Sequence, residues 1–225
     1  MEFLEQEHIS PALLDGVRAY RAQYPAEPAL QGRIPQPRYH YYGKEVWEAA
    51  IAALLCGENL LLAGSKATGK NVLAENLAQA FGRPAWDVSF HVSMDAAGLI
   101  GMDTFENGQV TFRPGPVYLC AKNGGFGILD EINMAKNEAL AVLHATLDFR
   151  RAIDVPGYDR VEMDPAARFI GTMNYGYEYL CGIAGMFGIP ETRFACAENL
   201  DVVGADIEAN LNEARKVLAQ LKATR

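Results

Sequence analysis

The sequence has no long hydrophobic run and no excess of positive charge. Its longest uninterrupted apolar stretch, at 49–56, has eight residues, whereas a membrane-spanning helix needs roughly 20. The 225 residues carry 20 Lys and Arg against 28 Asp and Glu, a formal net charge of −8. Nucleic acids and anionic membrane surfaces are bound by clustered cations. We therefore expect neither a nucleic acid nor a membrane as the partner.

Cysteine is scarce, and the first ten residues contain no Lys or Arg. The four cysteines, at 56, 120, 181 and 196, have no Cys-x-x-Cys spacing, and the histidines at 40, 91 and 144 have no metal-ligand spacing. Reduced, packing cysteines are typical of a cytoplasmic protein. A signal peptide starts with a basic segment that leads into an apolar one, so none is expected here.

The composition is that of a folded protein. Hydrophobic residues make up 50% and charged residues 21% of the chain, which excludes wholesale disorder. The length corresponds to one large domain or to one domain with an appendage. We expect an N-terminal leader at 1–42, a core domain at 43–200 and a C-terminal helix within 201–225.

Short apolar runs alternate with helical patterns along the chain. This alternation predicts an α/β fold, in which a parallel sheet has helices on both faces. Asn107-Gly108 and Pro156-Gly157 each predict the turn of a hairpin. The predicted strands are 59–63, 86–92, 126–129 and 168–173, and the predicted helices are 9–20, 44–56, 71–81, 115–122, 136–149 and 207–221.

The segment GSKATGK, at 64–70, fits the pattern G-x-x-x-x-G-K between a predicted strand and a predicted helix. Its glycines allow the backbone to curl so that N–H groups point at phosphate oxygens, and the lysine adds a positive charge. A bare glycine turn is the alternative interpretation. The predicted nucleotide-binding residues are Gly64, Ser65, Lys66, Ala67, Thr68, Gly69, Lys70, Asn71 and Val72.

Acidic residues end the predicted strand at 126–129. Asp130 is expected to bind Mg²⁺, and Glu131 to orient the attacking water, because ligands bind at the carboxyl ends of parallel strands. Asn71 stands where Ser or Thr usually completes the phosphate loop. Its amide oxygen is also a suitable magnesium ligand. Asn174 ends the next predicted strand and is expected to reach the γ-phosphate.

These motifs, in this order, resemble the AAA+ ATPases. The phrase Asp130-Glu-Ile-Asn-Met-Ala135 is similar to the MoxR and dynein-related branch, which includes NorQ-, CbbQ- and GvpN-like proteins. The matched positions are the Walker A residues Gly64, Gly69 and Lys70, the Walker B residues Asp130 and Glu131, the sensor 1 residue Asn174 and the arginine-finger candidate Arg193.

The resemblance implies a P-loop three-layer fold with a five-stranded parallel sheet in the order 5-1-4-3-2. It also implies hydrolysis of ATP with Mg²⁺ by a ring, often a hexamer. The ring would remodel or mature a partner protein, often together with a von Willebrand factor A domain protein. Since about thirty residues follow Phe194, we expect the family's C-terminal helical lid to be absent or truncated.

Several alternatives stay open at the level of sequence. A nucleotide-dependent interaction module with little or no hydrolysis would account for Asn71 and the missing lid. Arg193 is an arginine finger or an ordinary surface residue. Tyr39, Tyr41 and Tyr42 are expected either to stack on adenine or to pack in the core. Phe105 and Phe112, which flank the hairpin turn, are expected either to contact a partner or to pack within the domain.

Overall fold

The computed structural model describes residues 1–174 except 107, 156 and 159. The chain divides into two units, Met1–Leu62 with Gly69–Met173, and Ala63–Thr68 with Asn174–Arg225. Across the described ranges, no helix is both long and apolar enough to pass through a membrane.

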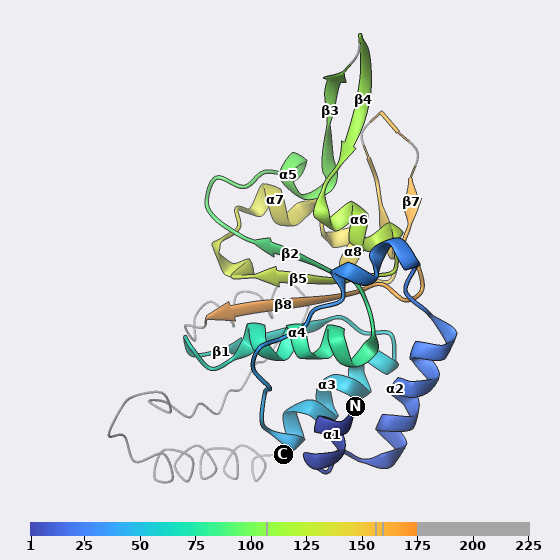
Figure 1. Cartoon of the computed structure of the whole chain (residues 1–225). Helices are drawn as coiled ribbons and strands as arrows, with labels where there is room; N and C mark the ends of the chain where they lie inside the picture. Colours follow the sequence, from blue (N-terminus) through green and yellow to red (C-terminus); the bar gives the residue numbers. More distant parts are fainter. Residues whose placement is uncertain (107, 156, 159, 175–225) are drawn as a thin grey trace. The chain divides into compact units, whose positions relative to one another are not determined.

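The described elements alternate along the chain as predicted (Figure 1). The helices are α1 Glu2–Gln6, α2 Pro11–Gln23, the 3-10 helix η1 Pro28–Arg33, α3 Lys44–Leu55, α4 Lys70–Phe81, α5 Ala96–Ile100, α6 Pro116–Lys122, the 3-10 helix η2 Ile132–Met134, α7 Asn137–Ala141 and α8 His144–Leu147. The strands are β1 Leu60–Gly64, β2 Ala85–Ser89, β3 Gly101–Glu106, β4 Gln109–Pro114, β5 Phe126–Asp130, β6 Ala152–Ile153, β7 Val161–Glu162 and β8 Arg168–Asn174.

The central sheet has four strands in the order β1-β8-β5-β2. Strand β5 pairs in parallel with β2 on one side and with β8 on the other. Numbered along the chain, these strands run 1-4-3-2, which confirms the corresponding part of the expected order. The fifth strand of that order is expected after β8 and lies outside the described residues.

Two apolar clusters cover the two faces of this sheet. Helices α2, α3 and α4 pack on one face, against Phe126, Ile128 and Ile170. Helices α5, α6 and α7 pack on the other, against Leu129 and Phe169 (Figure 1). Side chains alternate between the faces of a strand, and a sheet buried on both faces therefore has continuous apolar strands. Strands β5 and β8 are such strands.

The N-terminal segment packs against the same core. Leu14, Val17 and Tyr20 of α2 belong to the apolar cluster that contains α3 and α4. The Tyr20 hydroxyl donates to the carbonyl oxygen of Ala166 at 2.6 Å. Burial raises the pKa of Tyr20 to about 12. A buried hydroxyl must be hydrogen-bonded, so this contact fixes α2 next to the turn that leads into β8.

The sequence predicts one continuous helix over 136–149, and this prediction is wrong. The chain forms α7 and α8, separated by Val142 and Leu143. The Leu143 amide donates to the Leu140 carbonyl, and the Thr146 amide donates to the Leu143 carbonyl. These three-residue spacings belong to a tighter 3-10 turn, which interrupts the α-helical ladder. The strand predicted over 86–92 is also shorter, because β2 ends at Ser89.

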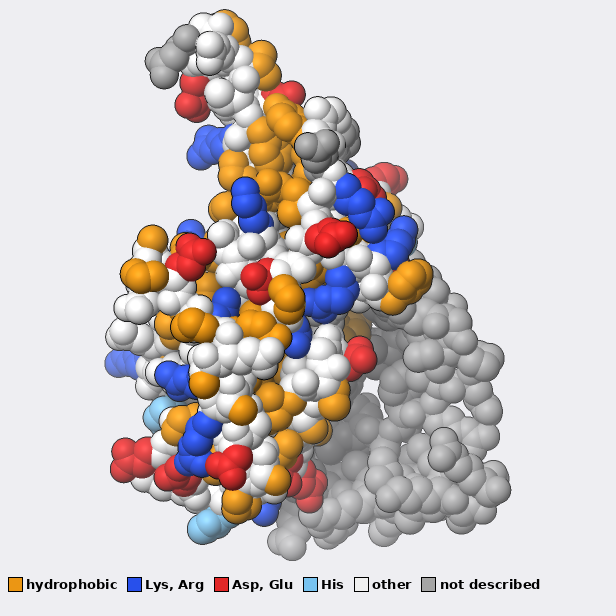
Figure 2. All heavy atoms as spheres, turned by 90° about the vertical axis from the view of Figure 1, so that its right-hand side faces the viewer, with side chains coloured by type: hydrophobic (Ala, Val, Ile, Leu, Met, Phe, Trp, Pro, Cys, Tyr) orange, Lys and Arg blue, Asp and Glu red, His pale blue; other side chains and the backbone are white. Residues whose placement is uncertain are grey.

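Both predicted hairpins are present as antiparallel pairs, β3 with β4 and β6 with β7. In the first, Phe105 lies opposite Val110, and their side chains are 75% and 63% exposed. Figure 2 shows hydrophobic side chains along this hairpin, at the top of the view. Phe112 instead packs against Tyr118 and Tyr158. The hairpin therefore has an exposed apolar tip and a packed aromatic base.

Buried arginines bind backbone carbonyls where β5 and β8 begin. The Arg168 guanidinium donates to the carbonyl oxygens of Leu54, Pro165 and Ala167 at 2.7–3.0 Å. Arg83 donates to the carbonyl oxygen of Gly124, just before β5. Loop carbonyls buried without a donor would each cost a desolvation penalty. These arginines donate to such carbonyl oxygens, and those of Leu54 and Ala167 also accept from the Gly57 amide and the Arg151 guanidinium. The two guanidinium groups join α3 and the loops to the sheet.

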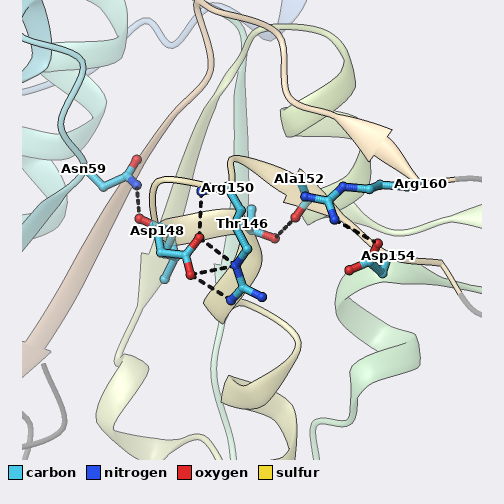
Figure 3. Close-up of polar contacts among 8 residues, drawn as sticks. Asn59, Thr146, Asp148, Arg150, Ala152, Asp154 and Arg160 are labelled. Atoms are coloured by element: carbon cyan, nitrogen blue, oxygen red, sulfur yellow. Dashed lines mark hydrogen bonds and ion pairs between the residues drawn. The ribbon is translucent and has the colours of Figure 1, made fainter.

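We predict that Arg168→Met destabilises the fold by about 2–4 kcal/mol, because three hydrogen bonds from the buried guanidinium to backbone carbonyl oxygens are lost. The matched control is Arg160→Met. Arg160 is half exposed and lies 3.8 Å from Asp154 (Figure 3), and such surface pairs contribute about 0–1 kcal/mol. Urea denaturation of both variants measures the difference. Equal losses of unfolding free energy in the two variants would contradict a structural role for the buried guanidinium.

Candidate functional site

The phosphate-loop segment has its own compact turn. Within Ala63–Thr68, the Thr68 hydroxyl donates to the Ser65 carbonyl oxygen at 3.0 Å. Ala67 adopts a left-handed backbone with φ 64°. A residue with a Cβ rarely takes this conformation, and such strain clusters at functional sites. The sequence motif placed glycines where the chain curls, but it did not indicate that Ala67 is strained.

Helix α4 begins immediately after this segment. Gly69 is its N-cap, with φ 79°, and Lys70 is its first residue. Burial lowers the pKa of the Lys70 ammonium, while the charges of Asp130 and Glu131 act in the opposite direction. A partly desolvated ammonium group at a helix N-terminus is suited to bind an anion, and the two carboxylates favour its charged form. The first unit therefore brings together three of the predicted site residues.

The two acids lie at the carboxyl end of β5. The Thr172 hydroxyl on β8 donates to Asp130 Oδ1 at 2.6 Å. The backbone amide of Glu131 donates to the same hydroxyl oxygen at 3.3 Å. Glu131 itself has φ 51°, a left-handed conformation, and is the N-cap of η2. One buried side chain thus contacts both acidic residues.

The other predicted residues lie as follows. Asn71 is exposed at the second position of α4. Val72 is partly buried, and its carbonyl oxygen accepts from the Asn76 side chain at 2.7 Å. Asn174 is the last residue of β8 and belongs to the second unit. Arg193 lies outside the described residues.

The tyrosine-rich segment before α3 lies against the start of α4. A Cβ on Gly69 would be 3.3 Å from the Tyr41 ring. The indole N–H of Trp47 donates to the Tyr41 carbonyl oxygen at 2.8 Å. Tyr39 and Tyr42 are 63% and 71% exposed. Of the three tyrosines, Tyr41 is therefore packed against the phosphate-loop glycine, and adenine stacking stays a prediction.

Sequence reasoning missed Thr172. The available signal was a hydroxyl residue in an otherwise apolar stretch of β8, two positions before the polar Asn174. A buried polar side chain needs a hydrogen-bond partner, and strand alternation places Thr172 on the same face as Ile170. Only the pairing of β8 with β5 identifies Asp130 as that partner.

The chemistry of these groups fits a nucleotide with Mg²⁺. Lys70 supplies a cation at the start of α4. Asp130 supplies a carboxylate, the hard oxygen ligand that Mg²⁺ prefers. Among the residues that the structure describes, no three His, Cys, Asp or Glu side chains form a cluster suited to a metal. Mg²⁺ commonly binds through one or two carboxylates together with substrate phosphates and water.

The sheet order, the loop between β1 and α4 and the acids at the end of β5 define a P-loop nucleoside-triphosphatase fold. The family model for the AAA domain (dynein-related subfamily) matches residues 59–180, more than half of the chain. The chain therefore belongs to this AAA family.

The chain is also similar in sequence to curated proteins from Bacillus and Staphylococcus. YojN of Bacillus subtilis is 40% identical over 142 residues, 61% of this chain and 46% of the relative. SSP1341 of Staphylococcus saprophyticus is 34% identical over 182 residues, 78% of this chain and 66% of the relative. SAB1265c of Staphylococcus aureus is 32% identical over 187 residues, which make up 80% of this chain and 70% of the relative. This chain thus spans about half to two thirds of the length of these relatives.

A crystal structure of a Cytophaga hutchinsonii protein also matches. It has a TM-score of 0.47 and 15% sequence identity over 77% of this chain and 48% of that chain. The family assignment rests on the sequence matches.

We predict that Gly69→Ala destabilises the protein more than Gly57→Ala. Both positions have positive φ, 79° and 94°, so a Cβ costs about 1–2 kcal/mol of backbone strain at each. At Gly57 the nearest atom is 4.0 Å away, whereas at Gly69 the Tyr41 ring lies at 3.3 Å. Thermal unfolding measures the difference.

The same comparison in a Tyr41→Ala background isolates the ring contact. There, the cost of Gly69→Ala should fall to that of Gly57→Ala. An unchanged difference would show that Tyr41 does not restrict the loop.

Proposed function

We propose that this chain binds ATP with Mg²⁺ and hydrolyses it to ADP and phosphate. One observation carries the proposal: Lys70 is the first residue of α4, and Asp130 and Glu131 stand at the carboxyl end of β5 in the same unit, where their charges act on the Lys70 ammonium. This combination of a cation for phosphate and acids for metal and water is the one that P-loop hydrolases use. Membership of the AAA family supports it.

The proposed roles follow from the chemistry of each side chain. Backbone amides of Gly64–Gly69 and the Lys70 ammonium hold phosphate oxygens. Asp130 and Asn71 hold Mg²⁺, which when bound neutralises charge that develops on the phosphates. Glu131 accepts a hydrogen bond from the attacking water and orients it toward phosphorus. Its position on a strained turn at the end of a rigid strand suits this task.

Asn174 and Arg193 complete the proposal. Asn174 would donate its amide to the γ-phosphate region. Arg193 would supply positive charge to a neighbouring subunit's nucleotide, as arginine fingers do. That role requires a ring, and we propose a hexamer. The core domain would extend over 43–200, with a leader before it and a C-terminal helix after it.

We further propose that ATP turnover drives remodelling or maturation of a partner protein, as in the MoxR, NorQ and CbbQ branch. A protein with a von Willebrand factor A domain is the proposed partner class. The exposed apolar tip of the β3–β4 hairpin, with Phe105 and Val110, supports a contact with another polypeptide, because exposed apolar clusters mark interaction sites.

The second candidate is a nucleotide-gated interaction module with little or no hydrolysis. Asn71 favours it, since an amide replaces the usual hydroxyl at the metal position. Both candidate functions require nucleotide binding. They differ in whether the bound ATP is hydrolysed at an appreciable rate.

ATP turnover by the purified chain with Mg²⁺ tests the proposal. We expect activity that Lys70→Ala abolishes, because the phosphates lose their cation. Lys122→Ala is the matched control, since Lys122 is on α6 and its ammonium contacts the Tyr118 ring. Activity that rises faster than linearly with protein concentration would support the ring and the finger. Tight ATP binding without turnover would favour the interaction module.

We expect Glu131→Gln to retain ATP binding and to lose turnover by at least about 100-fold, because an amide does not polarise water as a carboxylate does. Asp130→Asn should instead weaken nucleotide binding only when Mg²⁺ is present. Fluorescent-nucleotide titrations with Mg²⁺ or with EDTA separate the two effects. Undiminished turnover in Glu131→Gln would remove Glu131 from the mechanism.

A further inference from the structure

Thr172 is a buried hydroxyl residue next to both acids. Only 1% of its surface is exposed. Its hydroxyl donates to Asp130 Oδ1 at 2.6 Å and accepts from the Glu131 backbone amide at 3.3 Å. A hydroxyl can donate once and accept at the same time. Thr172 uses both capacities on two consecutive residues, the last residue of β5 and the one that follows it.

The strand register makes these contacts necessary. Leu129 of β5 pairs with Gly171 of β8, so the next residues along the two parallel strands are Asp130 and Thr172. Threonine is β-branched, and its χ1 angle is restricted in a strand. The hydroxyl is therefore held at one position relative to Asp130, at little further entropic cost.

The contact with Asp130 fixes the direction of its carboxylate. An O–H···O⁻ bond of 2.6 Å is in the short, charge-assisted range. It prevents free rotation about the last torsion of the side chain, and the carboxylate plane is set by β8. A second residue that orients a metal ligand in this way affects metal affinity by about 10–100-fold in known sites.

The contact with Glu131 holds the backbone in a strained turn. Glu131 has φ 51°, which is costly for a residue with a Cβ. Its amide hydrogen bond to Thr172 stabilises this conformation at the point where η2 begins. The turn decides the direction in which the Glu131 side chain leaves the strand.

We propose that Thr172 is a positioning residue that orients Asp130 for Mg²⁺ and holds the Glu131 turn for catalysis. The inference rests on the proposed function, because it concerns the metal and water of that reaction. Thr172 acts through these two neighbours.

The test compares Thr172→Val, which keeps the shape and removes the hydroxyl, with Thr172→Ser, which keeps the hydroxyl. The matched control is Thr146→Val. Thr146 is fully buried, and its hydroxyl donates to the Ala152 carbonyl oxygen at 3.5 Å in another part of the domain (Figure 3). This control reports the cost of burying a valine in place of a hydrogen-bonded threonine.

For Thr172→Val we expect nucleotide affinity in EDTA to stay within about twofold and affinity with Mg²⁺ to fall by at least about tenfold. Turnover falls by at least as much, and Thr172→Ser restores both. Amide hydrogen exchange at Glu131 becomes faster in Thr172→Val. In an Asp130→Asn background, Thr172→Val adds no further loss of Mg²⁺ dependence. Thr146→Val changes none of these quantities.

Several results would overturn the inference. These are an unchanged Mg²⁺ dependence in Thr172→Val, an equal change in Thr146→Val, or a failure of serine to rescue. If Thr172→Val melts below the assay temperature, Thr172→Cys replaces it. Because a thiol is only a weak donor, we expect the same loss of Mg²⁺-dependent nucleotide affinity in Thr172→Cys. A wild-type chain that binds no nucleotide overturns the proposed function as well, whereas wild-type binding with a Mg²⁺-insensitive variant overturns this inference alone.

Discussion

The parallel pairing of β5 with β8 is the constraint on which the candidate site depends. Parallel strands bring their carboxyl ends to one edge of the sheet, where ligands bind in α/β folds. Here the register of Leu129 with Gly171 makes Asp130 and Thr172 neighbours. A shift of one residue would turn Thr172 to the opposite face of the sheet. The hydroxyl contact with both acids exists only in the observed register.

The edge of the sheet where β5 and β8 begin contributes to the stability of the fold. Arg168 begins β8 and Arg83 binds the carbonyl before β5, so buried guanidinium groups fill the region where these strands start. Tyr20 of the N-terminal segment contacts the same region through Ala166. The acidic residues lie at the carboxyl end of β5, whereas guanidinium groups bonded to backbone carbonyl oxygens lie where β5 and β8 begin. Such a bonded framework allows a strained residue such as Glu131 to persist directly after a rigid strand.

Much of the fold could be predicted from local patterns. The apolar runs that became β1, β5 and β8 and the two hairpin turns were identified because strand alternation and turn chemistry are local signals. The prediction of one continuous helix over 136–149 is wrong, since the tight turn at Leu143 accompanies the burial of that side chain in the core, which local sequence does not encode. Thr172 and Tyr41 were not assigned their contacts for the same reason: Asp130 and Gly69 are distant along the chain.

The sequence by itself determined the class of fold, the phosphate-loop motif and the identity of the acids, because each is encoded in residues that are close together in the chain. The tertiary structure decided which face Thr172 occupies, that Tyr41 restricts Gly69, and that Glu131 adopts a left-handed turn. These features arise from pairing and packing between segments that lie 28 (Tyr41 to Gly69) to 42 (Asp130 to Thr172) positions apart. No local propensity specifies such contacts; they follow from the register of the sheet and the packing of the segment before α3.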